Sequence, residues 1–149
     1  MTKQIWTALA LMAWGGGALA QQWTYVEMNP NDPPYLSGAA TQVTSRDGTV
    51  RMDYTCTSEG STLMLTGGVV ERLPSPAYIS FLIDGWAQPT IEMTEYEGAL
   101  FAQPPAALLD AFAAGSLVDV YLVGTTNNFT SFPLRGSSAA LRAARANCR

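Results

Sequence analysis

Carboxylates are the side chains of this chain whose number and spacing could support catalysis. Glu92, Glu95 and Glu97 lie close together, and Asp84 precedes them at the end of an apolar run. Two acids on either side of a cleft can hydrolyse a glycosidic bond, so Asp84 with Glu92 or Glu95 is a candidate pair for cleaving a glycan such as peptidoglycan. The competing interpretation is a solvated strand edge that discourages aggregation. We favour it, because nothing in the sequence marks either acid as desolvated.

Other catalytic side chains are scarce. The chain has no histidine, which removes the commonest general base, the Ser–His and Cys–His nucleophile pairs and most zinc sites. No glycine-rich loop precedes a helix in the way that phosphate binding requires. The leading expectation is therefore a protein without enzymatic activity, cofactor or metal.

Exposed aromatic side chains could bind a peptide or a sugar instead. Trp86 and Tyr96 lie in segments rich in turn residues and polar residues, and are the candidates for such a surface. The ordinary place for an aromatic residue in a small β-rich domain is the core, and we favour that for the aromatic residues as a group.

The two cysteines, Cys56 and Cys148, are predicted to form a disulfide. In the run 50–56 the even-numbered residues face the core, Cys56 included, while Arg51, Asp53 and Thr55 face water. Near the chain end, Leu141, Ala144 and Cys148 make one apolar stripe on a short helix, which Ser137 or Ser138 could cap. Cysteines in an exported protein more often pair than not, so we expect a C-terminal helix clipped onto the strand of Cys56.

Residues 1–20 have the features of a signal peptide: Lys3, then an apolar run, then Ala18-Leu19-Ala20 as the cleavage site. Cleavage would leave residues 21–149 as a single domain beginning at Gln21, periplasmic or secreted, with no stable membrane insertion. That domain has seven arginines and twelve acidic residues, a net charge of about −5. Such a balance argues against nucleic acid as a partner.

The remaining pattern predicts a mainly β fold. The turn signals are frequent, Asp47-Gly48 and Asp84-Gly85 among them, and the expected strands are short. Residues 29–37 and 67–76 are expected to be loops, and Pro104-Pro105 introduces a short helix that ends at Gly115. Strands are expected at 23–28, 41–45, 49–56, 62–66, 78–83, 89–97, 117–123 and 129–134. We predict an antiparallel sandwich or open barrel with a mid-chain helix and a C-terminal helix.

An ordered set of features spans about two-thirds of the chain after the leader. They are Arg51-Met-Asp-Tyr-Thr-Cys56, Ile83-Asp84-Gly85, a helix after Phe101-Ala-Gln-Pro-Pro, a strand containing Val120, and Phe132-Pro-Leu-Arg-Gly136 with Ala139-Ala140-Leu141 and Cys148. This order resembles the type VI secretion-associated periplasmic proteins of the TagO/VasI kind and, more loosely, the invasion-associated locus B proteins. The resemblance implies a periplasmic, non-catalytic accessory domain with one disulfide. The sequence departs from the pattern at Ile83, where an arginine is expected, and in the segment before Cys56.

The sequence thus favours an exported accessory domain that binds an envelope protein and is associated with a secretion system. Two alternatives remain open. One is the carboxylate-dependent glycan hydrolase, and the other is a binder that inhibits an envelope hydrolase through Trp86 and Tyr96.

Overall fold

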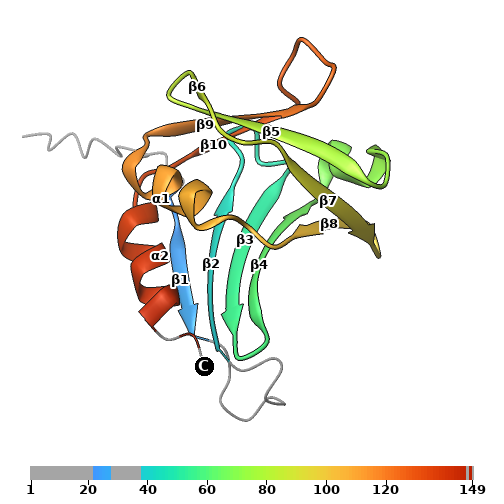
Figure 1. The fold of residues 1–149 in the computed structure, drawn as a ribbon. Coiled ribbons are helices and arrows are strands. Elements are labelled where there is room, and N and C mark those ends of the chain that lie inside the picture. The colour runs from blue at the N-terminus through green and yellow to red at the C-terminus, as the bar shows by residue number, and fades with distance from the viewer. Residues whose placement is uncertain (1–21, 28–37, 147, 149) are drawn as a thin grey trace, which may run out of the picture.

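A computed structural model of the chain describes residues 22–27, 38–146 and 148. The expected signal peptide and the loop expected at 29–37 lie outside the described residues. Ten strands form one antiparallel sheet in the order β1-β2-β3-β4-β8-β7-β5-β9-β10, with β6 beside β5. The sheet curls into a half-barrel, and α1 and α2 lie together at its open side (Figure 1). The mainly β fold with two helices is therefore confirmed.

The strands are short, as predicted. Their bounds are β1 (Thr24–Glu27), β2 (Gly38–Thr44), β3 (Arg51–Thr57), β4 (Gly60–Thr66), β5 (Ala77–Ile83), β6 (Trp86–Ala87), β7 (Ile91–Tyr96), β8 (Ala99–Ala102), β9 (Leu117–Leu122) and β10 (Thr130–Pro133). The helices are α1 (Ala106–Ala114), α2 (Ser137–Ala146) and the 3-10 helix η1 (Gly68–Arg72), which lies where a plain loop was expected.

Two tight hairpins organise the middle of the chain. Asp84 and Gly85 both have positive φ (50° and 83°), the geometry of a two-residue hairpin turn whose twist matches its strands. Glu97 and Gly98 repeat it with φ of 50° and 81°, and turn β7 into β8. The sequence pattern predicted one strand over 89–97 and no strand at β8, because Glu97-Gly98 is a weaker turn signal than an Asp-Gly pair.

The core lies on the inner face of the curled sheet. β5 is central, since it pairs with β6 and β7 on one side and with β9 on the other. Its alternate residues Ala77, Ile79, Phe81 and Ile83 are buried, as expected for a strand with one face in the core. On β7 only Ile91 and Met93 are buried, as the sequence predicted.

Residues around Trp23 close the half-barrel at its helical side. The backbone N–H of Trp23 donates to the carbonyl of Arg135 at 3.0 Å, and its indole Nε1 donates to the carbonyl of Pro133 at 3.2 Å. The N–H of Arg46 donates to the carbonyl of Ser131 at 2.9 Å, which links the β2–β3 turn to β10. The two ends of the sheet are thus held near each other, and the helices cover what remains open.

Helix α1 buries the face that the sequence predicted: Leu108, Leu109 and Phe112. Gly115 ends the helix, though with extended backbone rather than the left-handed conformation of a typical glycine cap. Glycine is needed there for space, since a Cβ at residue 115 would lie 2.3 Å from Cγ2 of Ile83 and 2.9 Å from Cδ1 of Leu134.

Helix α2 packs against α1, β1 and β2 through Ala140, Leu141 and Ala144. The hydroxyl of Ser137, a predicted cap, instead donates to the buried carbonyl of Phe112 at 2.6 Å and so ties α2 to α1. The helix ends at Ala146, so Cys148 lies beyond it rather than on its stripe. The disulfide from Cys56 to Cys148 is present, with the two Cα atoms 5.0 Å apart, and the predicted clip is confirmed.

The prediction that Asp53 is exposed to water was wrong. It points to the outer face of β3 as predicted, but it is only 7% exposed, because Gln42 and Met64 flank it on the neighbouring strands and Arg51 covers it. Nε of Arg51 lies 2.8 Å from Oδ2 of Asp53. Burial raises the pKa of Asp53 above 3.8, and the contact with Arg51 opposes that rise only in part.

This predicts that Asp53→Asn stabilises the fold at neutral pH. Because the folded-state pKa is raised, the protonated acid contributes stability below about pH 3.8 that is lost as the pH rises through the folded pKa. The variant should melt higher than the wild type at neutral pH and flatten the decline in stability above pH 3.8, as followed by thermal unfolding at a series of pH values.

Asp47→Asn is the control of opposite sign. Hydrogen bonds from the Ser45 hydroxyl and from Thr49 lower the pKa of Asp47. That stabilisation is present above pH 3.8 and is lost as the pH falls through the lowered pKa, so Asp47→Asn should destabilise at neutral pH and converge with the wild type in acid. If Asp53→Asn were also destabilising at neutral pH, the pairing with Arg51 would outweigh burial.

Candidate interaction site

The carboxylates considered for hydrolysis hold turns. Asp84 accepts hydrogen bonds from the backbone N–H groups of Ser116 and Leu117, at 3.0 Å each, and so pins the β5–β6 turn to the start of β9. Glu95 accepts from the N–H of Gly98 at 2.7 Å, inside the β7–β8 hairpin. Both acids therefore have structural partners in the backbone.

The same acids are far apart along the sheet. Glu92 pairs with Tyr78, which lies six residues before Asp84 on β5, or about 20 Å of strand. Glu95 lies farther still from Asp84 along the same ribbon. The carboxylates of glycosidases are roughly 5–9.5 Å apart. The structure does not bring Asp84 together with either glutamate.

Trp86 and Tyr96 are both on the surface, 78% and 65% exposed. Trp86 follows the β5–β6 turn, and Tyr96 precedes the β7–β8 turn, so they mark opposite ends of the ribbon formed by β6 and β7 (Figure 1). They are available for contacts, but they do not form one surface together.

Two open grooves adjoin on the helical side of the molecule and share Arg145. We call the first the helix groove: it lies between α1 and α2 and is lined by Ala113, Ser138, Leu141, Arg142, Arg145 and Ala146. We call the second the disulfide groove; it has a volume of about 370 Å³, within the range of small ligand sites. Both cysteines, Cys56 and Cys148, line it, together with Tyr54, Ser61, Pro104 and Leu109.

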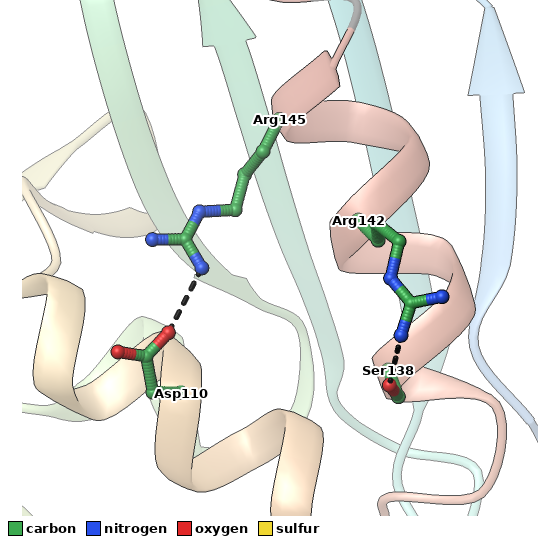
Figure 2. A network of polar contacts seen from close by, with 4 residues as sticks. All are labelled: Asp110, Ser138, Arg142 and Arg145. Carbon is green, nitrogen blue, oxygen red and sulfur yellow. Dashed lines mark hydrogen bonds and ion pairs between the residues drawn. The ribbon is translucent and has the colours of Figure 1, made fainter.

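Arg145 of α2 reaches toward Asp110 of α1, whereas Arg142 lies along α2 itself (Figure 2). Nη1 of Arg145 lies 2.9 Å from Oδ1 of Asp110 on α1, in a pair whose side chains are 42% and 68% exposed. Arg142 donates to the hydroxyl of Ser138, one turn earlier on α2, at 3.4 Å. These contacts are weak enough in water to be exchanged for contacts with a bound anion.

Charge is unevenly distributed along the sequence, and these arginines belong to its basic part. Residues 135–149 contain four arginines and no acidic residue, whereas residues 21–134 contain three arginines and twelve acidic residues. A net charge of −5, on which the expectation of no nucleic-acid partner was based, conceals this division. Residues 135–149 are the part of the chain that would attract an anionic partner.

The disulfide positions this basic segment. Cys148 lies just past the end of α2, and its bond to Cys56 ties that end to the inner face of β3. A helix of ten residues such as α2 is only marginally stable alone in water. Through this bond Cys56 holds the end of α2 that carries Arg145, in addition to stabilising the fold.

Within residues 22–27, 38–146 and 148, no three His, Cys, Asp or Glu side chains gather in a way that could hold a metal ion. No helix in these ranges has the length and apolarity needed to cross a bilayer.

A solved structure shares this fold. It is the crystal structure of invasion-associated protein B from Bartonella henselae, with a TM-score of 0.58 over 83% of this chain and 92% of that chain, at 14% sequence identity. No protein-family model and no curated protein matches the sequence. The likeness shows a common fold and supports the looser of the two sequence resemblances. The resemblance to the type VI secretion-associated proteins rests on the sequence pattern alone.

Proposed function

We propose that this chain is an exported, non-catalytic domain of the cell envelope that binds an acidic segment of a protein partner at the face formed by α1 and α2. The observation that carries the proposal is Arg145, which lines both grooves and belongs to the basic segment of an otherwise acidic chain. An acidic partner is attracted to this face and repelled by the rest of the surface. The signal-like leader supports export, and the type VI resemblance makes secretion machinery the first class of partner to examine.

The proposal predicts a cross-link that depends on the arginines. A photo-reactive amino acid at Ser138, which is exposed on α2, should give a discrete adduct with one envelope protein in living cells, and mass spectrometry should place it in an acidic segment. Arg142→Gln with Arg145→Gln should abolish the adduct, because both charges of the grooves are lost.

The matched control removes two arginines elsewhere. Arg46→Gln with Arg72→Gln changes the net charge by the same amount, at exposed positions in a turn and in η1, and should leave the adduct intact. If both double variants lost the adduct equally, the effect would be one of net charge, and the proposal that the partner binds the face of α1 and α2 would be wrong.

A second candidate rests on Trp86. An aromatic side chain that is 78% exposed, on a hairpin fixed by Asp84, has the form of an anchor that enters a partner's cleft, as in an inhibitor of an envelope hydrolase. The same experiment with the photo-reactive residue at Gln88 separates the two. An adduct there with a hydrolase, unaffected by the arginine variants, would favour the inhibitor.

A further inference from the structure

Strand β4 has an open edge beside the disulfide groove. All seven of its residues, 60–66, pair with β3, but only residues 63–66 pair with β8. Within the described ranges, the far side of residues 60–62 therefore has no neighbouring strand. Gly60 and Thr62 direct their backbone groups to β3, so Ser61 is the residue whose N–H and C=O face this open side, where an extended segment can satisfy them.

The edge is open because two prolines divert the chain. Ala102 of β8 is opposite Leu63, so continued pairing would bring Gln103, Pro104 and Pro105 alongside residues 60–62. Proline has no N–H to give to a ladder, and Pro105 instead precedes α1 at its N-cap position. The chain leaves the sheet there, and the disulfide groove occupies the space beside Gly60 and Ser61.

The groove lies on the inner face of this edge. Ser61 is opposite Cys56, and the groove is lined by the inner-facing Tyr54 and Cys56 of β3, by Leu109 of α1 and by Arg145 of α2. In a strand added along β4, alternate side chains would point to this inner face and the others to solvent. A side chain directed inward would meet an apolar wall and then the guanidinium of Arg145.

From this arrangement we infer that the acidic partner segment binds as an added β-strand along residues 60–62, with one inward glutamate or aspartate paired to Arg145. The inference rests on the proposed function and adds the mode of binding to it. The strand edge supplies affinity that is independent of sequence, and Arg145 supplies the preference for an acid.

Asp110 has a definite role in this mode. Its carboxylate occupies Arg145 in the unbound protein, at 2.9 Å, and would be displaced by the acid of the peptide. Removing it should therefore strengthen binding, whereas a residue that merely supported the fold would weaken binding when lost.

The test uses a short capped peptide of alternating threonine and valine with one central glutamate, titrated into the disulfide-bonded protein and followed by NMR. The amide signals of residues 60–62 should shift, and the N–H of Ser61, which faces the added strand, should gain protection from exchange. Arg145→Gln should weaken binding about tenfold, as loss of a charge-assisted hydrogen bond does. Asp110→Asn should tighten it about two- to threefold, the size of an exposed ion pair. Arg72→Gln, on η1, should have no effect.

Methylation of the peptide backbone separates strand addition from charge. N-methyl groups on the alternate amides that face β4 should abolish binding, while methyl groups on the intervening amides should leave it nearly unchanged. If both methylated peptides bind as well as the parent and Arg145→Gln still weakens binding, strand addition is wrong and the proposed function stands. If no signal shifts at saturating peptide, or if glutamine in place of the peptide's glutamate makes no difference, both fail.

Discussion

Replacing Cys148 with serine is expected to lower the melting temperature by on the order of 10 °C. The disulfide joins residues 92 apart in sequence, and closing a loop of that length in the unfolded chain stabilises the folded state by about 4.6 kcal/mol in the chain-entropy model. A domain of this size typically has a net stability of only about 5–15 kcal/mol, so the loss is a large share of it. Thermal unfolding of the oxidised wild type and of the variant measures the difference.

Loss of the disulfide should affect α2 more than the rest of the fold. Ala140, Leu141 and Ala144 are the buried apolar contacts of α2, and two of them are alanines, whose burial contributes little each. Without the clip, α2 and the Cys56 end of β3 should lose hydrogen-exchange protection first. Reduction of the wild type should reproduce both effects. A variant that melts within a degree or so of the wild type would show that the crosslink does not hold α2 in place.

Phe112→Ala is expected to destabilise the fold by about 3–5 kcal/mol, the range for a fully buried phenylalanine. Phe112 is 0% exposed, and its ring centroid lies 6.0 Å from that of Trp23 and 5.7 Å from that of Phe81. It thus joins the N-terminal edge, the central strand and α1, and its backbone carbonyl accepts the hydroxyl of Ser137. Denaturant unfolding, with the midpoint and the slope both measured, gives the change in free energy.

Phe101→Ala is the matched control for this truncation. Phe101 lies on β8 opposite Met64, on the outer face of the sheet, and is partly exposed. Its removal leaves no enclosed cavity and should cost clearly less than the removal of Phe112. Equal losses at the two positions would mean that the contact among Trp23, Phe81 and Phe112 is not the centre of the core.

The disulfide and Phe112 have different relations to the proposed site. Loss of the disulfide frees the end of α2 that carries Arg145, so peptide binding should weaken even at temperatures where the variant is folded. Phe112 supports α1 from beneath, and once the variant is fully folded the grooves above it retain Arg142 and Arg145. Comparing binding at low temperature therefore separates positioning of the arginines from stability.

Residue patterns over short stretches of the sequence determined much of the fold. The alternation of Ala77, Ile79, Phe81 and Ile83 required a strand with one buried face, and Asp84-Gly85 required a tight turn, because both signals depend only on residues within a few positions. The pairing of Cys56 with Cys148 followed from their number alone, once the compartment was inferred. Helix α1 and its buried residues could also be predicted from neighbouring residues alone.

What only the tertiary structure decided depends on residues that are distant in sequence. Asp53 was predicted to face water. Its side chain does lie on the outer face of β3, but Gln42 on β2 and Met64 on β4 flank it, and it is buried there. The acids around Asp84 looked adjacent in sequence, yet a sheet places residues by register, and about 20 Å of strand separates them.

The candidate site lay beyond sequence reasoning for the same reason. It joins Ser61 on β4, Leu109 on α1 and Arg145 on α2, which meet only when the half-barrel closes on its helices. The sequence by itself determined that residues 135–149 are basic and that a disulfide could hold them. The tertiary structure decided which surface this segment covers. It also placed an open strand edge beside the segment, because the chain leaves the sheet at Pro104 and Pro105.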